Sequence, residues 1–443
     1  MSVDKLMLWI SIACGCGLLI AFGAITADKN LFPGKQVKFQ ARKIVDVVKQ
    51  VTETQKELNL PGGGPRFQTY QPEKAQPGLT LIGAVGADAK NAFTVVEADG
   101  TEIHKWAIDW FEIWPDADQS RMPKELLPNR HPGVVTHGFH VTQAGEIVFN
   151  FEYLSTVKLN ACGDVMWKLD NRGHHFVTPD YDDDLWVGEV VKHENWQEFP
   201  YQNYRMPVRE DSIVELSPEG EAKRTFSMID LYHRNDLHGL MTASSTLLEG
   251  TWATRDVHHL NDAELFPADM VEGFFKRGDM ILSPRNDNTV LVFDTETMEV
   301  KHHFQGRLVR QHDPDFTSGN SYIVFDNHNR LREGGAQRSR ILEVTVDDNG
   351  NTIGVEELLR GPNAVDFFTA VMGWQQPLAN GNMLVVVSFD GRILELTPEG
   401  EAVWEFRNAI GENRRGAVTD AERLPPEMDA AFFAEARAAC GGG

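Results

Sequence analysis

The sequence of 443 residues predicts an all-β body, a six-bladed β-propeller, preceded by an N-terminal transmembrane helix and a short helical stalk. Three observations lead to this class: an apolar segment near the N-terminus, a heptad pattern after it, and a strand-turn-strand unit that recurs along the rest of the chain. We expect four parts: an anchor (1–28), a stalk with a Gly/Pro linker (29–65), the propeller (66–426), and a C-terminal helix and tail (427–443).

An apolar segment of 20 residues without charge runs from Leu6 to Ile25. At about 1.5 Å per residue it spans a hydrocarbon core of ~30 Å. A cleavable signal peptide is the alternative, but its apolar region usually has about 7 to 15 residues, and no small-x-small site follows because Ile25 stands two positions before Ala27. We therefore expect one uncleaved span in the inner membrane.

The charges around this segment favour one orientation for the body. Lys5 precedes the segment, and five basic residues follow it: Lys29, Lys35, Lys38, Arg42 and Lys43. Taken alone, the positive-inside rule places the body in the cytoplasm.

A heptad pattern follows the anchor. Its apolar seam alternates steps of four and three, at Val37, Ala41, Ile44, Val48, Val51, Gln55 and Leu58. A short coiled coil that joins copies of the chain satisfies this pattern, and so does a helix packed on its own domain. The run Pro61–Pro65, with three glycines between the prolines, ends the helix. A homo-oligomer formed through the stalk is thus one expectation.

A repeated hairpin fills the body. Its six copies begin at Thr94, Thr156, Ser212, Thr289, Ile341 and Ile393. Apolar residues alternate with period two, and the turns between strands are rich in residues that accept φ > 0. A further strand opened by a glycine turn precedes several copies, at Gly145, Gly278, Gly319 and Gly381. Each repeat therefore has roughly four strands.

Repeats of about 50 residues, each a sheet that cannot bury its own faces, close best as blades around an axis. A β-sandwich would not need one hairpin six times, and a solenoid would show tighter spacing. The longest interval, from Gly220 to Met298, holds an insertion rich in His and Asp, which we expect to build the site. We expect the helix from Met428 to Ala439 to dock on the propeller through Phe432 and Phe433.

Composition excludes one class of partner. The 42 Lys and Arg face 65 Asp and Glu, a net charge of -23, and such acidity opposes binding to a phosphate backbone. We therefore expect no nucleic acid. Cys14 and Cys16 lie in the apolar segment, while Cys162 and Cys440 stand far apart, so we expect neither a disulfide framework nor a cysteine zinc site.

Candidate chemistry lies in four short segments that lead into blade strands. They are Thr136–His140, Asp256–Asn261, Ser283–Asn286 and Arg310–Asp313. In a propeller the inner strands converge on the axis, so these segments can face one another. Several imidazoles with one guanidinium suit an oxyanion such as a sulfuryl or phosphoryl group, because Arg offers a planar fork and a neutral His is a nucleophile.

At these residues the chain resembles the bacterial arylsulfotransferase family, whose members move sulfuryl groups between phenols without a nucleotide donor. The resemblance covers Leu79 to about Pro426. Its motifs are the hairpin Phe93–Trp106, Asp256-x-x-His259-x-Asn261, Ser283-x-Arg285, and Gln311-His312-Asp313 followed by Phe325-Asp326-Asn327. The order of these motifs, together with six repeats, makes the resemblance more specific than each motif alone.

The resemblance implies a role for each matched residue. His312 corresponds to the histidine that is transiently sulfurylated, and His259 and Arg285 to residues that bind the sulfuryl oxygens. His137 is the match for the remaining active-site histidine, with His140 as its rival. Three further residues, Asn261, Gln311 and His140, are expected to bind substrate. Departures at Pro284, Asp262 and His258 bear on substrate choice.

The resemblance also implies an aryl sulfate donor, a phenolic acceptor, no cofactor, no metal, and a body on the periplasmic side. It opposes the orientation that the flanking charges favour, and we adopt the periplasmic side.

Two other function classes stay open. One is a metal-dependent hydrolase or lyase in which His137, His259 and His312 ligate a divalent ion, although Arg285 beside a cation would be repelled. The other is a membrane-tethered, non-catalytic scaffold. We interpret the remaining histidines as structural: His104, His174, His175, His193, His233, His238, His302, His303 and His328. The run from Asp180 to Asp184 has no EF-hand spacing, so we read it as a solvated loop.

Overall fold

The computed structural model describes residues 65–195, 197, 199, 201, 206–242, 256–328, 337–411 and 414–440, all within one compact unit, Leu60–Gly443. The expected transmembrane helix and heptad segment lie outside these residues. Within the described ranges, no helix has the length and apolar character needed to cross a bilayer.

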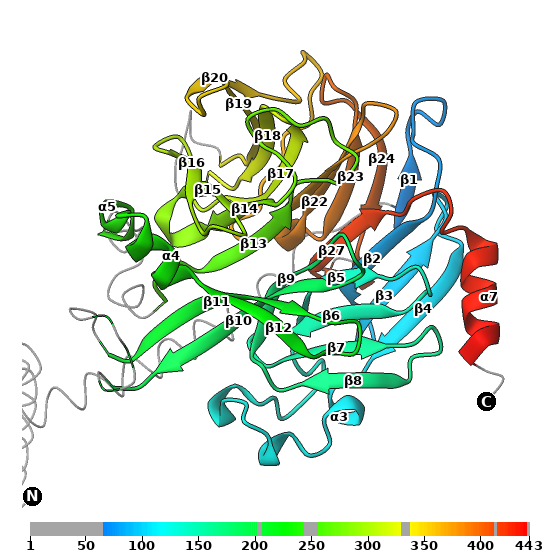
Figure 1. The fold of residues 1–443 in the computed structure, drawn as a ribbon. Helices are drawn as coiled ribbons and strands as arrows, with labels where there is room; N and C mark the ends of the chain where they lie inside the picture. The colour runs from blue at the N-terminus through cyan, green and yellow to red at the C-terminus, as the bar shows by residue number, and fades with distance from the viewer. Residues whose placement is uncertain are drawn as a thin grey trace, which may run out of the picture. The chain divides into compact units, whose positions relative to one another are not determined.

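The described strands form a six-bladed β-propeller, as predicted (Figure 1). The first blade contains β27 (Val418–Arg423), β2 (Thr80–Val85), β3 (Asn91–Val96) and β4 (Glu102–Ile108). The second contains β5 (Thr136–Val141), β6 (Ile147–Phe151), β7 (Ser155–Leu159) and β8 (Val165–Leu169). The third contains β9 (Gly173–Pro179), β10 (Leu185–His193), β11 (Val208–Leu216) and β12 (Ala222–Ser227).

The other three blades complete the circle. The fourth contains β13 (Leu260–Leu265), β14 (Asp279–Pro284), β15 (Thr289–Asp294) and β16 (Val300–Gln305). The fifth contains β17 (His312–Ser318), β18 (Ser321–Asp326), β19 (Arg340–Val346) and β20 (Thr352–Glu357). The sixth contains β21 (Trp374–Pro377), β22 (Met383–Val387), β23 (Arg392–Leu396), β24 (Ala402–Arg407) and β1 (Phe67–Thr69). The first strand of each blade neighbours the first strand of the next, so β27, β5, β9, β13, β17 and β21 surround the axis.

Each of the six predicted hairpins forms the third and fourth strands of a blade, counted from the axis, from β3–β4 to β23–β24. The turns use positive φ, as expected from their composition. Gly100 and Gly400 have φ of +90° and +84°, and in the fourth blade Met298 takes the same region at +62°. Residues that accept positive φ in the turns therefore determine the hairpin that recurs in every blade.

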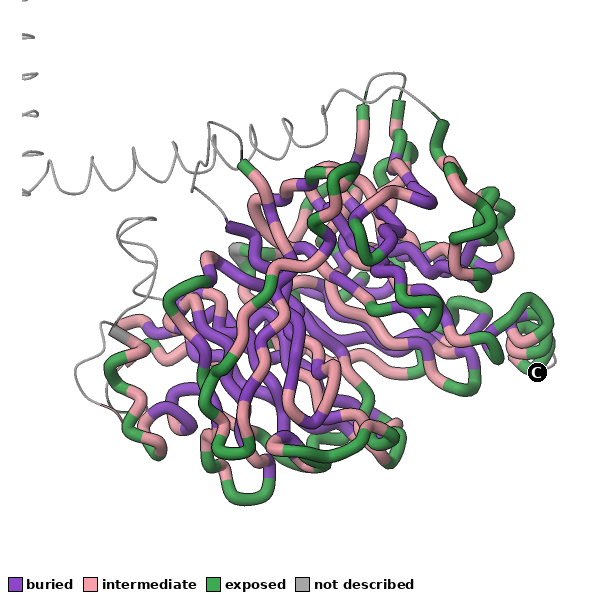
Figure 2. Tube along the Cα trace, turned by 90° about the horizontal axis from the view of Figure 1, so that it is seen from above, coloured by how far each residue is buried: buried purple, intermediate pink, exposed green. Residues whose placement is uncertain are grey.

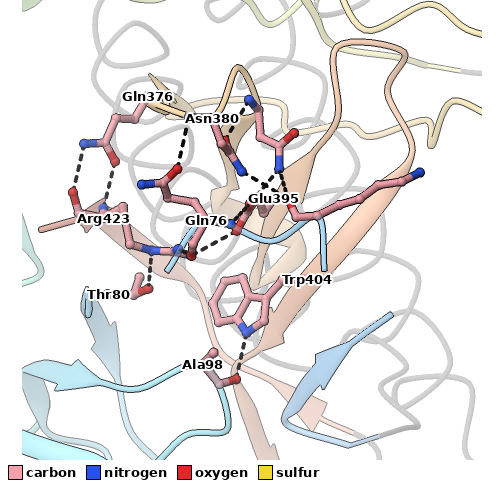
Figure 3. Close-up of polar contacts among 10 residues, drawn as sticks. Gln76, Thr80, Ala98, Gln376, Asn380, Glu395, Trp404 and Arg423 are labelled. Atoms are coloured by element: carbon pink, nitrogen blue, oxygen red, sulfur yellow. Dashed lines mark hydrogen bonds and ion pairs between the residues drawn. The ribbon is translucent and has the colours of Figure 1, made fainter. Parts of the chain in front are cut away.

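Segments from both ends of the described chain close the ring. β1 pairs with β24 of the last blade, and β27 supplies the innermost strand of the first. Between these blades Arg423 binds Glu395 at 3.2 Å and donates from Nε to Thr80 Oγ1 at 3.0 Å (Figure 3). The two charged side chains are 4% and 0% exposed, so removal of either would leave the other charge buried without its partner.

Apolar contacts between blades form the core. Figure 2 shows the buried positions running along the strands, whereas exposed positions gather in the connecting loops. Between the first and second blades, Phe93 packs on Phe149, with ring centroids 5.2 Å apart. Each blade thus buries faces that it could not bury alone.

Four helices belong to the described insertions and to the C-terminus: α3 (Trp110–Ile113), α4 (Met228–Arg234), α5 (His238–Thr242) and α7 (Ala430–Cys440). The predicted docking of the last helix is confirmed. Phe433 is fully buried and stacks on His104, with ring centroids 5.2 Å apart. Apolar burial therefore attaches α7 to the outer strand of the first blade.

The prediction that the chain has no disulfide was wrong. Cys162, in the turn between β7 and β8, is bonded to Cys440 at the end of α7, 278 residues away. Their separation in sequence concealed the pairing, because only the docking of α7 brings the two sulfurs together. The bond therefore fixes the C-terminal helix to the second blade.

Cys162→Ser should lower the free energy of unfolding by about 2 to 5 kcal/mol, the usual cost of losing a native disulfide. The physical reason is that the disulfide joins residues 278 positions apart, so its loss raises the conformational entropy of the unfolded chain. Thermal melts of the wild type with and without reductant, and of the variant, provide the measurement. Reductant should have no further effect on the variant, and a wild-type melting temperature insensitive to reductant would contradict the expectation.

Candidate functional site

A cavity of about 240 Å³ lies between the innermost strands. Four of the expected site residues line it, His137, His140, Asn261 and His312, together with His175. Three of the four predicted motifs therefore contribute directly to one axial site, since each stands at or near the beginning of an inner strand. The fourth, with Arg285, follows β14; Arg285 and His259 do not belong to the cavity lining, and the main-chain N–H of Arg285 contacts the carbonyl of His259.

His312 begins β17 and is 4% exposed. Its Nδ1 lies 2.6 Å from Asn327 Oδ1 and 3.0 Å from the carbonyl of Arg310. Asn327 must present its oxygen, because its amide nitrogen donates to two main-chain carbonyls. The ring proton therefore sits on Nδ1, and the Nε2 lone pair accepts from the Met372 N–H at 3.2 Å. Burial, and then the charge of Arg285, holds the pKa of His312 well below its usual value.

Arg285 opens a short 3₁₀ turn, η3 (Arg285–Asp287). Its main-chain N–H donates to the carbonyl of His259 at 3.1 Å, and its Nη2 donates to Asn286 Oδ1 at 3.2 Å. Its Nε is buried and has no hydrogen-bond partner among the described residues. A buried N–H without an acceptor is costly. An oxyanion is the ligand that would satisfy it, because charge-assisted bonds to guanidinium are strong.

His259 is held by a carboxylate. Its Nδ1 lies 2.6 Å from Asp256 Oδ2, and its Nε2 lies 3.5 Å from the hydroxyl of Tyr153. The guanidinium of Arg209 covers the ring of Tyr153 at 4.4 Å. Burial and the charge of Arg285 lower the pKa of His259 in spite of Asp256. At neutral pH His259 is therefore neutral, with its proton toward Asp256.

His137 has the opposite charge state. Its Nδ1 lies 3.1 Å from Glu152 Oε2, and the N–H of the next residue, Gly138, donates to Asp420 Oδ2 at 3.2 Å. Burial alone would lower the pKa of His137, but the carboxylates of Asp420 and Glu152 outweigh it and raise the pKa to about 9. His137 is thus an imidazolium at neutral pH, beside a neutral His312.

A glycine permits the close approach of two inner strands. Gly138 has φ of +64°, and a Cβ there would lie 1.7 Å from the carbonyl oxygen of His175. The rings of His137 and His175 are consequently 4.6 Å apart. His175 also lies 3.4 Å from Glu152, and its Nδ1 is 2.8 Å from that of His174. The pair His174–His175, which we expected to be structural, is therefore part of the site.

Several site residues occupy the left-handed region of backbone space. Tyr153, His175, His259 and Asp313 have φ of 60°, 59°, 52° and 51°. Such conformations cost of order 1 to 3 kcal/mol for residues other than glycine and persist where the surrounding structure enforces them. Their concentration around one cavity is typical of a functional site.

The expected substrate-binding residues differ in their placement. Asn261 lines the cavity, with Nδ2 donating to the carbonyl of Gln311 at 2.9 Å and Oδ1 without a partner in the described structure. Gln311 is fully buried and does not line the cavity, because its Nε2 donates to Ser283, Pro284 and Thr289 in the wall. His140 lines the cavity, and burial lowers its pKa to about 4.

Residues capable of holding a metal also differ from those expected. The ligand atoms of His137, Glu152 and His175 lie within 4.8 Å of one another, and they form the one such group of three found among the described residues. The alternative set of His137, His259 and His312 does not meet this distance.

Sequence reasoning missed four residues that act on the site: Glu152, Tyr153, Arg209 and Asp420. Glu152 and Tyr153 directly follow the apolar run of β6, so a polar pair at a strand end was the one available signal. Arg209 and Asp420 stand in strands whose alternation is ordinary, and only the closure of the ring brings them to the site.

Fold and site together define a six-bladed propeller with an axial cluster of histidines and, next to it, an arginine whose buried Nε has no hydrogen-bond partner among the described residues. A family model described as arylsulfotransferase (ASST) matches residues 138–409. The chain belongs to the arylsulfotransferase family, as the motifs predicted.

Among solved structures, the chain is similar to a protein of unknown function from Bacteroides caccae, at 12% identity and a TM-score of 0.47, covering 78% of this chain and 98% of that chain. It is also similar to virginiamycin B lyase from Staphylococcus aureus, at 11% identity and a TM-score of 0.35, covering 67% of this chain and 86% of that chain. No curated protein matches the chain.

Proposed function

We propose that the protein is a nucleotide-independent sulfotransferase that moves a sulfuryl group from an aryl sulfate to a phenol through a sulfohistidine on His312. The observation that carries the proposal is the neutral His312, with its tautomer fixed by Asn327 and its pKa lowered by burial and by the charge of Arg285, whose Nε–H is unpartnered among the described residues. A nucleophile and an anion-binding donor thus stand together in a buried site.

In the first half-reaction Nε2 of His312 releases the Met372 N–H, and its lone pair forms a bond to sulfur as the bond from sulfur to the phenolic oxygen breaks. The departing phenolate takes a proton from the imidazolium of His137. Arg285 donates to the sulfuryl oxygens, on which charge resides in the transition state. A bound sulfuryl anion also favours the imidazolium of His259, whose Nε2–H then donates to the same group.

In the second half-reaction the oxygen of the acceptor phenol attacks sulfur and the bond from sulfur to Nε2 of His312 breaks. His137, now neutral, takes the proton of the acceptor. The enzyme returns to its first state, so the donor phenol leaves before the acceptor reacts and the kinetics are ping-pong.

A chromogenic aryl sulfate tests the proposal against a scaffold role. With 4-nitrophenyl sulfate as donor and phenol as acceptor, release of 4-nitrophenol should depend on both. Initial rates at several fixed acceptor concentrations should give parallel double-reciprocal lines. If no 4-nitrophenol is released with any acceptor, the result would instead favour the non-catalytic scaffold.

The state of His137 predicts the alkaline limit of the donor half-reaction. Because its pKa is raised to about 9, His137 keeps its proton through neutral pH and loses it as the pH rises through about 9. The value of kcat/KM for the aryl sulfate should therefore fall above about pH 9. In Glu152→Gln this limb should move to lower pH by about 1 to 3 units, because an opposite charge at hydrogen-bond distance is lost.

The matched control is Glu146→Gln. Glu146 pairs with Lys158, outside the cavity lining, and its variant should keep the wild-type pH profile. A merely structural role for Glu152 would lower activity without moving the limb, and a wild-type limb near pH 6.5 would contradict the assignment of His137.

A metal-dependent hydrolase is the second candidate, favoured by the proximity of His137, Glu152 and His175. Two histidines and one glutamate are a known ligand set for catalytic zinc. Elemental analysis and activity after chelation distinguish the two. Activity lost with chelator and regained with metal, in protein that forms no sulfohistidine, favours the metal.

We propose a periplasmic location for the propeller, on an inner-membrane anchor formed by Leu6 to Ile25. The bond between Cys162 and Cys440 supports this side of the membrane, because disulfides persist in oxidising compartments.

A further inference from the structure

A pair of acidic residues separated by one position recurs on three innermost strands. The pairs are Asp262 and Glu264 on β13, Asp313 and Asp315 on β17, and Asp420 and Glu422 on β27. Asp420 acts on His137, but the sulfuryl-transfer steps use none of the other five. Because the inner strands surround the axis, four of the five, Asp262, Glu264, Asp313 and Glu422, line the cavity beside the histidines, and Asp315 is hydrogen-bonded to Glu264.

The five carboxyls lack a basic partner. No Lys, Arg or His among the described residues forms an ion pair with Asp262, Glu264, Asp313, Asp315 or Glu422; the charges that act on them are those of other carboxyls in the group. The hydrogen bonds that they do make are few: Asp313 and Asp315 each accept one from Gln375, at 2.6 Å and 2.8 Å. Such a cluster of buried acids is unfavourable without a positive charge.

Uncharged oxygen atoms at the same place also lack partners. Asn261, 7% exposed, lines the cavity and leaves Oδ1 without a hydrogen bond in the described structure. Gln375, 1% exposed, donates through Nε2 to the carbonyl of Asp313 and to Asp315 Oδ2, the latter at 2.8 Å, and leaves Oε1 without a bond. One carboxylate oxygen of Asp262, 6% exposed, is likewise unpartnered. These oxygens are acceptors that face no donor.

We propose that the axial channel binds one Ca²⁺ ion through the carboxylates of Asp262, Glu264, Asp313, Asp315 and Glu422 and the amide oxygen of Asn261. The ligands are all hard oxygen atoms, which favours Ca²⁺ or Mg²⁺ over zinc or copper. They come from three separate strands, and as the side chains stand no three of the five carboxylates have oxygens within 4.8 Å of one another, so they would move toward the axis to bind one ion. Ca²⁺ fits such a set better than Mg²⁺, because it takes about 6 to 8 oxygens at ~2.3 to 2.6 Å in flexible geometry, including water.

The ion supplies the positive charge that the channel lacks. It would join the first, fourth and fifth blades at the axis, next to β17, which carries His312. Bound only by the folded ring, it should stabilise the propeller in proportion to its occupancy.

Calorimetric titration of the EDTA-treated, full-length protein with CaCl₂ tests this site. We expect one ion per chain and a melting temperature that rises with Ca²⁺. In Asp262→Asn/Asp315→Asn the dissociation constant should increase at least about tenfold and the Ca²⁺-dependent rise should disappear. The variant should melt no lower than the wild type in EDTA, because the amides remove repulsion.

The matched control is Asp182→Asn/Asp183→Asn in the acidic turn between β9 and β10, which should bind Ca²⁺ as the wild type does. If the channel double variant fails to fold, Glu422→Gln gives the same test with one substitution. A wild type with no heat and no shift in melting temperature would overturn the proposal. So would loss of binding in the turn variant alone, or an equal response to MgCl₂. Sulfuryl transfer is measured separately, so failure of this site leaves the proposed reaction testable.

Discussion

His312→Ala should abolish sulfuryl transfer and the covalent intermediate together. The substitution removes the imidazole that carries the nucleophilic Nε2. That ring lines the cavity, and burial and the charge of Arg285 keep it neutral. In wild-type protein quenched with 4-nitrophenyl sulfate alone, mass spectrometry should find one added sulfuryl group on the peptide that contains His312. Because the covalent route is lost rather than slowed, no choice of acceptor should restore the rate.

His303→Ala is the matched control, since His303 is exposed on β16. It should label and turn over as the wild type does. A sulfuryl group on His259 or His137 would overturn the identity of the nucleophile, and retention of activity in His312→Asn would refute covalent catalysis by this residue.

Arg285→Ala should lower kcat by about 10² to 10³, the usual cost of removing one preorganised donor from a developing anion. The Nε–H of Arg285 has no hydrogen-bond partner among the described residues, so we expect it to donate to the sulfuryl oxygens. The fall should lie mainly in kcat, because charge on those oxygens matters most in the transition state. Steady-state kinetics with 4-nitrophenyl sulfate measures both constants.

Arg285→Lys should recover part of this loss, since an ammonium keeps the charge but not the planar fork. Arg307→Ala, on the exposed turn after β16, should leave the kinetics unchanged. A loss confined to KM, with kcat preserved, would show that Arg285 binds donor and transition state equally. Reduced labelling of His312 in Arg285→Ala, at equal donor occupancy, would agree with a role in the chemical step.

The site was predicted in part because motifs mark strand ends. His137, His259, Arg285 and His312 stand where blade strands begin or end, and in a propeller these positions converge. Of the two residues that set the charge of His137, Glu152 also stands at a strand end, after β6, but belongs to no motif, and Asp420 lies within β27. Glu152 approaches His137 from the second blade and Asp420 from the first. Their effect on the pKa of His137 depends on distances in the folded ring, which the alternation of apolar and polar residues along a strand does not encode.

Sequence by itself determined the six blades and the C-terminal helix. Alternation of period two and turn residues with positive φ act over a few positions, so they can be read locally at Thr94 or Ile393. Tertiary structure alone decided the bond from Cys162 to Cys440, the inclusion of His175 in the site, and the ring of unpaired carboxyls around Asp262 and Asp315. These features join residues on separate blades, and their energies depend on burial and on approach across the axis, which exist only once the ring has closed.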